Sequence, residues 1–369
     1  MNMLSIPGAP GWFETLLNMS LQATLLTGVV WIVLKVFGRW VPPNWRALMW
    51  FLVIARVVIP FTSPSELSLL NFFTMPPSEV TRIVQFQQAP EAEFSVPPAV
   101  ASHVASETPT VTVVANAGPF APRRAVSAGE MVMNIWRIGA LFLLALLGLR
   151  ALLIRFRLVR HGAAPAPFIL ELLEECRAEL GLRYPIRVTV SDQIAAPALT
   201  GIIPARLIIP TTFGTPRFTP AQMRQILLHE LAHVRQGHLF FHWLTLIARA
   251  IHWFNPAIHF AANRLRQECE IAADRAALTN STSEERATYG ETILQVLVNS
   301  KAAPTLLALG MAEQARHLQQ RLRALTTSQR FFTPLGVACV LFVGLAGVVG
   351  GAAPADQKAS APGTNSESE

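Results

Sequence analysis

The sequence predicts a mainly α-helical membrane protein, with four transmembrane helices and a cytoplasmic α+β domain inserted between the third and the fourth. Two observations favour this architecture. First, 51% of the 369 residues are hydrophobic and the mean hydropathy is +0.38, which is too apolar for an ordinary soluble chain. Second, four apolar segments are each long enough to cross about 30 Å of hydrocarbon as a helix of about 20 residues.

The four apolar segments set the predicted division of the chain. They are residues 16–37, 45–63, 131–154 and 331–352. No basic residue precedes the first, so it lacks the charged start of a cleaved signal peptide and is expected to remain a membrane helix. The predicted parts are two helices with a short cytoplasmic connection (1–63), a largely disordered extracytoplasmic loop (64–129), the third helix (130–156), the cytoplasmic domain (157–330), the fourth helix (331–353) and a disordered extracytoplasmic tail (354–369).

Lysine and arginine residues gather near the span ends on one side. They are Lys35, Arg39 and Arg46 after the first span, Arg155, Arg157 and Arg160 after the third, and Arg316, Arg321, Arg323 and Arg330 before the fourth. Because basic flanks stay in the cytoplasm, we expect a multi-pass protein of the inner membrane, with both termini outside and the inserted domain inside. The sequence pI of about 10.1 then reports these flanks, and direct nucleic-acid binding is not expected.

Within the inserted domain, local patterns predict a small sheet followed by helices. Residues 167–182 have the pattern of an amphipathic helix. Residues 186–192 alternate as a strand does, and residues 204–210 resemble a second strand closed by a proline. If that second strand is an edge of the sheet, it could pair with the backbone of a bound peptide. An Ile208→Pro variant that still processes its substrate normally would count against this pairing.

The following predicted helix carries two histidines one turn apart. Thr219 and Gln222 are spaced as a capping box requires, which marks the helix start. His229 and His233 then project from the same face. Two imidazoles at this spacing can hold one zinc ion at about 2.0–2.1 Å, and Glu230 between them could take a proton from an attacking water.

A catalytic zinc ion needs a third protein ligand, and the next predicted helix offers candidates. Glu270 and Asp274 lie one turn apart on one face of that helix. Glu270 could complete a His, His, Glu set, while Asp274 could accept the second ring N–H of His229 or His233. Glu268 is the alternative third ligand, although its helical phase relative to Asp274 is poorer.

The set of motifs resembles one known family. The segments HELAHVRQGH, WFNPAIH and ECEIAADRAAL, preceded by APALTGIIPARLIIP and bracketed by membrane spans, look like those of the BlaR/MecR-type integral-membrane zinc metalloproteases. The resemblance covers residues 15–352 or so. It implies a gluzincin-like protease domain with one zinc ion, three spans before it and one after it. It also implies these roles: zinc ligation by His229, His233 and Glu270, general-base catalysis by Glu230, and support behind the ligands by Asp274.

The chain departs from the family pattern at three places. Ala273 stands where the family commonly has cysteine, and His238 stands where it often has aspartate, but neither position is a required ligand. The best-known members carry a penicillin-binding sensor domain beyond the fourth span, which this sequence is expected to lack. The family link implies a protease in the lipid bilayer that cleaves a cytoplasmic protein, often a transcriptional repressor, and that sometimes cleaves itself.

Several candidate residues have simpler structural explanations. The carboxylates at 270 and 274 could instead form a solvated surface or pair with one of three nearby arginines, which are Arg264, Arg266 and Arg275. His238 and His242 also lie one turn apart, but their apolar surroundings favour a structural role over a second metal site. Arg56, inside the second span, could be functional or paired within the helix bundle. Tyr289 is expected to pack its own helix.

Three functions are carried forward. The first is a membrane zinc endopeptidase that cleaves a cytoplasmic regulatory protein, expected to be a transcriptional repressor, in signal transduction. The second is a quality-control protease of the HtpX/Ste24 kind, and the third is a non-catalytic transducer that binds zinc only to hold its fold. The WFNPAIH segment and the three-plus-one arrangement of spans favour the first function. Replacing Glu230 separates the third function from both enzymes.

Overall fold

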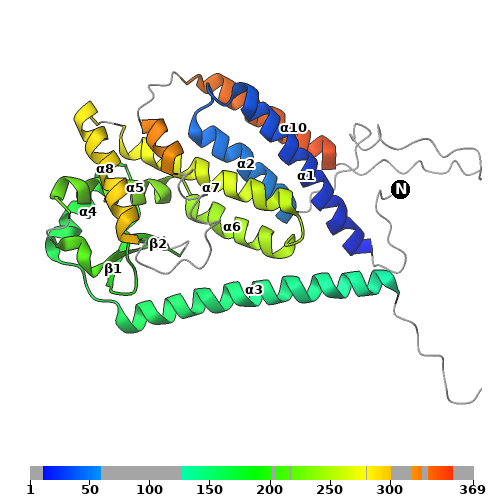
Figure 1. The fold of residues 1–369 in the computed structure, drawn as a ribbon, viewed down its shortest axis with the longest axis horizontal. Helices are drawn as coiled ribbons and strands as arrows, with labels where there is room; N and C mark the ends of the chain where they lie inside the picture. The colour runs from blue at the N-terminus through cyan, green and yellow to red at the C-terminus, as the bar shows by residue number, and fades with distance from the viewer. Residues whose placement is uncertain are drawn as a thin grey trace, which may run out of the picture.

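The computed structural model describes residues 11–59, 127–201, 205–215, 218–279, 281–300, 318–325 and 331–351. These residues form a mainly helical protein with one small sheet (Figure 1). The elements are α1 (Gly11–Phe37), α2 (Pro43–Val58), α3 (Ala128–His161), α4 (Pro167–Glu179), β1 (Arg187–Ser191), β2 (Ala198–Thr200), β3 (Arg206–Pro210), the short 3₁₀ helix η4 (Thr211–Gly214), α5 (Pro220–Arg235), α6 (His238–Ile251), α7 (Pro256–Ala277), α8 (Ser283–Ser300) and α10 (Thr333–Gly351). The predicted tail, and the predicted outer loop apart from residues 127–129, lie outside the described residues.

Two helices are long and apolar enough to cross a membrane. They are α1 and the Ala128–Arg157 part of α3, and most of the latter is exposed along one side of the molecule (Figure 1). The predicted second and fourth spans also form helices, α2 and α10. However, α2 has only 16 residues, or about 24 Å of helix, which is short for a span of about 30 Å. The arrangement of four spans therefore stays a prediction.

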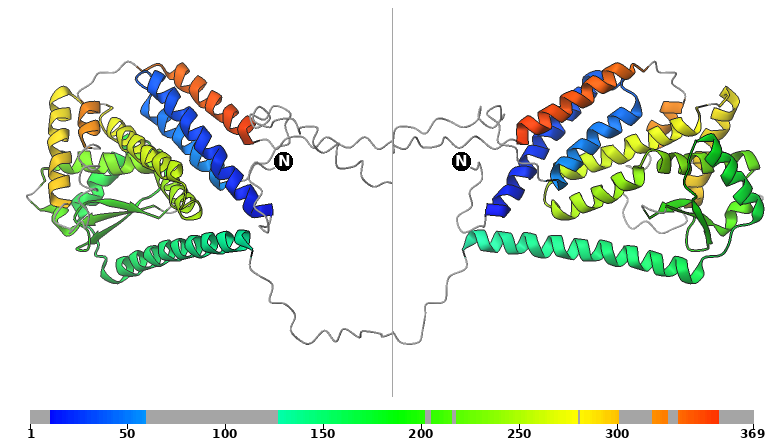
Figure 2. Two further views of the ribbon diagram at one scale, coloured as in Figure 1. Left: turned by 45° about the vertical axis from the view of Figure 1, so that its right-hand side comes forward. Right: turned by 180° about the vertical axis from the view of Figure 1, so that it is seen from behind.

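One hydrophobic core joins the predicted membrane helices to the helices that follow the sheet. Val53 and Ile54 of α2, Ile258 and Ala261 of α7 and Val343 of α10 are fully buried in this cluster. Figure 2 shows α1, α2 and α10 packed together as a bundle, with α7 and α6 against α2. α7 is therefore in direct contact with the apolar bundle.

Polar contacts reinforce the same interface. The Asn255 side chain caps α7 by accepting from the Ala257 N–H at 2.9 Å, and its amide group donates to Ser20 Oγ at 2.7 Å and Thr24 Oγ1 at 2.9 Å on α1. Between α2 and α1, Arg56 donates to Gln22 Oε1 at 2.8 Å. Of the two explanations for Arg56, the structure shows pairing inside the helix bundle.

The sheet has the strand order β1-β3-β2, in which β3 is parallel to β1 and antiparallel to β2. The prediction that residues 204–210 form a sheet edge is therefore wrong, because β3 is hydrogen-bonded on both sides. Three-residue β2 is the edge strand, and it was not predicted because so short a strand carries no alternating pattern. The outer side of β1 already meets Ala163, whose N–H donates to the Val190 carbonyl at 2.9 Å.

The second core lies between the sheet, α4 and α5. Leu173 of α4, Leu207 and Ile209 of β3, and Leu227 and Leu231 of α5 are completely buried there. The capping box at the start of α5 is confirmed: the Gln222 N–H donates to Thr219 Oγ1 at 3.2 Å, and the Thr219 N–H donates to Gln222 Oε1 at 2.9 Å. This fixed start and the buried leucines set the rotation of α5, which decides where its histidines point.

Candidate metal centre

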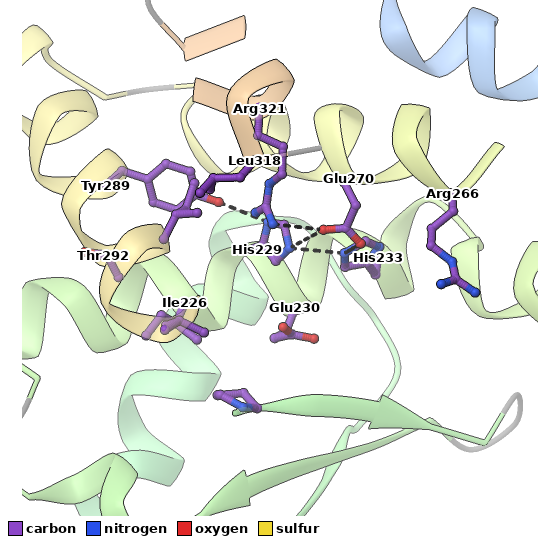
Figure 3. A pocket seen from close by; sticks show the side chains of 13 residues that line it. Ile226, His229, Glu230, His233, Arg266, Glu270, Tyr289, Thr292, Leu318 and Arg321 are labelled. Atoms are coloured by element: carbon purple, nitrogen blue, oxygen red, sulfur yellow. Dashed lines mark hydrogen bonds and ion pairs between the residues drawn. The ribbon is translucent and has the colours of Figure 1, made fainter. Parts of the chain in front are cut away.

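Three side chains from two helices converge beside the sheet. His229 and His233 come from one face of α5 and Glu270 comes from α7, and their potential ligand atoms all lie within 4.8 Å of one another (Figure 3). The two Nε2 atoms are 3.2 Å apart, and the glutamate oxygens lie 3.6 Å from His229 Nε2 and 3.7 Å from His233 Nε2. Ligand atoms around a tetrahedral zinc ion at about 2.0–2.1 Å are separated by about 3.3 Å, so this donor set fits zinc.

The alternative third ligand is used elsewhere. Glu268 Oε2 lies 3.0 Å from Arg46 Nε at the start of α2. This ion pair turns the Glu268 carboxylate toward the apolar bundle, while Glu270, two residues on, faces His229 and His233. Among the described residues, the His229, His233 and Glu270 group is the one cluster with metal-binding geometry.

His229 is held from behind by two buried groups. Its Nδ1 atom lies 3.0 Å from Asp274 Oδ1 and 3.0 Å from the Tyr289 hydroxyl, which itself donates to Asp274 Oδ1 at 2.7 Å. Asp274 is 1% exposed and Tyr289 is 2% exposed. With Nδ1 engaged in this way, Nε2 is left to face Glu270. Tyr289 thus does more than pack its helix, and only its contact with Asp274 could have revealed this.

His233 is held from behind by another histidine. Its Nδ1 atom lies 2.8 Å from Nδ1 of His238, the first residue of α6. Burial lowers the pKa of His238 to about 3, so the ring is neutral and can accept a hydrogen bond. When His233 Nε2 faces a metal ion, its Nδ1 carries the proton and donates to His238. His238 therefore pairs with the metal centre and not with His242.

We expect His238→Ala to weaken zinc binding by about 10–100-fold, because the His233 ring loses the group that orients it. His238→Asp should restore most of the affinity, since a carboxylate oxygen can accept the same N–H. Competition with a fluorescent zinc chelator on the purified full-length protein measures both variants. His259→Ala is the matched control, because that ring bonds the Trp253 carbonyl away from the centre. Equal affinities for the wild type and His238→Ala would contradict the orienting role.

An arginine that no motif indicated completes the centre. Arg321, from helical residues 318–325, donates from Nε to Asp274 Oδ2 and from Nη2 to Asp274 Oδ1, both at 2.7 Å, and its Nη1 lies 3.3 Å from Glu270 Oε2 (Figure 3). Two of the three arginines considered from the sequence are engaged elsewhere. Arg264 lies on the Phe260 ring, and Arg275 lies on the Phe331 ring.

The electrostatics of the centre favour a positive charge at His229. Burial lowers the pKa of His229, but its hydrogen bonds to Asp274 and Glu270 more than offset this effect and raise the pKa to about 10. A bound cation would supply the same positive charge in the proton's place. For Glu270, these histidine contacts and Arg321 outweigh burial and hold the pKa below its usual value, which keeps the carboxylate ionised as a metal ligand must be.

Glu230 lies beside the three converging residues, on the side of α5 that faces the sheet (Figure 3). Burial raises the pKa of its carboxyl group to about 7, against an opposing effect of His229. A carboxyl group with this pKa can both accept and release a proton near neutral pH. The arrangement can therefore support attack of an activated water on a bound carbonyl.

Two cavities open on the centre, and His233, Glu230 and Glu270 line both of them. The smaller, of about 390 Å³, lies toward α8 and includes Pro197 next to β2. The larger, of about 840 Å³, extends toward α3, β2 and α6 and includes Leu199 of the edge strand. A polypeptide passing from one cavity to the other would cross the candidate metal centre.

Known proteins resemble this chain over most of its length. The family described as BlaR1 peptidase M56 matches residues 14–325. The methicillin resistance mecR1 protein of Staphylococcus aureus is 23% identical over 302 residues, which cover 80% of this chain and 49% of that protein. The regulatory protein BlaR1 of Bacillus licheniformis is 26% identical over 155 residues, which cover 42% of this chain and 26% of that protein. The chain thus spans about half the length of the curated relatives it matches most extensively.

Proposed function

The chain belongs to the BlaR1 peptidase M56 family, and on that premise we propose that it is a zinc endopeptidase of the inner membrane that cleaves a cytoplasmic regulatory protein. The observation that carries the proposal is the convergence of His229 Nε2, His233 Nε2 and the Glu270 carboxylate beside Glu230. A regulatory role for the cleavage is favoured over a quality-control role, because one of the similar proteins is named a regulatory protein. A transcriptional repressor is the substrate we propose.

In the proposed reaction, His229, His233 and Glu270 hold the zinc ion, which when bound supplies Lewis acidity toward water and the scissile carbonyl. Glu230 takes a proton from the attacking water and passes it to the nitrogen of the leaving amine, so that the broken C–N bond ends as a carboxylate and an amine. Asp274 fixes the His229 ring through Nδ1, and the same carboxylate is neutralised by Arg321.

The substrate backbone is proposed to lie along β2. This strand is the edge of the sheet, and Leu199, Thr200 and Gly201 line the larger cavity. An extended peptide paired with an edge strand gains main-chain hydrogen bonds and is held straight. Pairing with β2 in place of β3 keeps the predicted mode of binding and changes the strand that provides it.

The proposed orientation places the metal centre on the cytoplasmic side, with α1, α2, α3 and α10 as the four spans and both termini outside. The support is the basic residues at one end of the spans and the two long apolar helices. With α7 packed on α2, the active centre lies close to the inner membrane surface, where a soluble repressor can reach it.

The test is a comparison of new protein N-termini in cells that carry the wild type or Glu230→Gln at equal abundance. We expect a small set of cuts found only with the wild type, including one in a transcriptional regulator. Many cuts among misfolded membrane proteins would instead indicate a quality-control protease. Identical N-termini under membrane and cell-wall stress would indicate a non-catalytic transducer held together by zinc. Cuts within this chain itself would report self-cleavage.

A further inference from the structure

Five arginine side chains line the larger cavity next to the metal centre. They are Arg150 and Arg155 of α3, Arg187 of β1, Arg206 of β3 and Arg266 of α7. Among its lining residues, all of them described, the only carboxylates are those of the centre itself, at positions 230 and 270. The cavity therefore carries a strong excess of positive charge that reaches up to the metal centre.

These arginines are not neutralised within the described part of the chain. None of the five forms an ion pair with a described carboxylate, and Arg206 only donates to Thr189 Oγ1 at 3.3 Å. Arg187 and Arg206 are also directly paired in register across β1 and β3. Neighbouring like charges in a sheet are destabilising, and an anion bound between them would relieve that repulsion.

We propose that this cavity binds acidic side chains of the polypeptide substrate close to the bond that is cut. The proposal rests on the proposed peptidase function and adds a specificity to it. Complementary charge raises the rate of encounter and rejects cationic segments, because positive charges concentrated in a cavity focus the field. Basic polypeptides are disfavoured as occupants for the same reason.

The sheet geometry connects these arginines to the proposed backbone site. Thr200 of β2 is in register with Arg206, which is in register with Arg187, so the three residues form one row across the sheet. A peptide paired with β2 would extend this row by one strand, at about 4.8 Å per strand. The added strand lies two strand spacings, or about 9.6 Å, from Arg206. An arginine and a glutamate side chain that reach toward each other over β2 can span this distance together. Arg266, one helical turn before Glu270, lines both cavities beside the metal centre.

Anionic lipid is the competing occupant, because Arg150 and Arg155 lie toward the predicted cytoplasmic end of α3. The remaining arginines favour polypeptide: Arg187 and Arg206 come from the sheet, and Arg266 comes from the helix that carries Glu270. A lipid headgroup can bind at the end of α3 without reaching the metal centre, whereas the substrate must reach the metal centre to be cleaved.

The test measures binding separately from cleavage. Full-length Glu230→Gln protein in phosphatidylcholine nanodiscs is titrated into two fluorescent peptides that differ only in having glutamates or glutamines at the same positions. We expect the glutamate peptide to bind about tenfold more tightly at about 0.05 M salt, with the difference falling strongly at about 0.5 M as the charges are screened. The double variant Arg206→Glu, Arg266→Glu should lose the preference for the glutamate peptide and instead prefer a peptide with lysines at the same positions. Arg183→Glu, in the exposed turn before β1, is the control.

Each outcome decides the proposal. Equal binding of the glutamate and glutamine peptides overturns the proposal. It is also overturned if the Arg206→Glu, Arg266→Glu double variant retains a different amount of phosphatidylglycerol in mixed nanodiscs but keeps the peptide preference of the parent protein. Wild-type protein is then tested for cleavage of the same peptides. Acidic preference without cleavage supports the cavity and contradicts the peptidase function, whereas cleavage without acidic preference supports the peptidase and contradicts the cavity.

Discussion

Glu230→Gln will lower kcat for peptide-bond cleavage by about 10²–10⁴-fold while the protein keeps its zinc. Glutamine has nearly the same shape as glutamate but cannot accept a proton from the attacking water. The three converging residues, His229, His233 and Glu270, come from other positions of α5 and α7 and are unchanged. The measurement is kcat and KM on a peptide that the wild type cleaves, with the zinc content of each preparation determined by atomic emission.

The control for this variant is Glu171→Gln, which removes the same charge from an exposed position on α4. It should have wild-type kcat and zinc content. If Glu230→Gln loses zinc in proportion to activity, Glu230 holds the site together and is not its base. If kcat is unchanged, another group accepts the proton and the proposed mechanism is wrong.

Local features of the sequence predicted the parts of the molecule that depend on a few neighbouring residues. The start of α5 follows from the capping box at Thr219, and the shared face of His229 and His233 follows from their spacing of one turn. The choice of Glu270 as the third ligand was also predictable, because Glu270 and Asp274 lie one helical turn apart and therefore share one face of their helix. These inferences needed no knowledge of how the chain is folded in space.

Other parts depend on contacts between distant segments, which the sequence does not display. The position of β3 in the middle of the sheet results from β2, a strand too short to have a pattern of its own. The packing of α7 on α2 was also not predicted, since apolar faces do not specify their partners. Arg321 lies 47 residues from Asp274, and the sequence indicates only that it is one of the basic residues before the fourth predicted span.

The support behind the two histidines shows the same distinction. Asp274 was predicted to stand behind one of the two rings, and the structure puts it at His229. The group behind His233 is His238, which stands at a position where the resembling family often has aspartate. A neutral histidine at position 238 can accept the same hydrogen bond as an aspartate, so this departure is physically compatible with the metal centre.

Arg321→Met will destabilise the folded protein by about 3–5 kcal/mol, the usual cost of removing one partner from a buried ion pair. Asp274 is 1% exposed, and without Arg321 its charge is left with only the Tyr289 hydroxyl and the His229 ring as partners. Zinc binding should weaken as well, because Arg321 Nη1 also helps to fix the Glu270 carboxylate. The measurements are the midpoint of thermal unfolding in detergent and zinc affinity by chelator competition.

A double variant separates this charge effect from simple loss of side-chain packing. Arg321→Met with Asp274→Asn removes both charges, so it should be more stable than Arg321→Met alone, with a coupling energy of about 0.5–3 kcal/mol. Arg323→Met, at an exposed position of the same helical segment, should change the midpoint little, since exposed ion pairs contribute about 0–1 kcal/mol. If the double variant is no more stable than Arg321→Met, then Arg321 contributes volume and not charge.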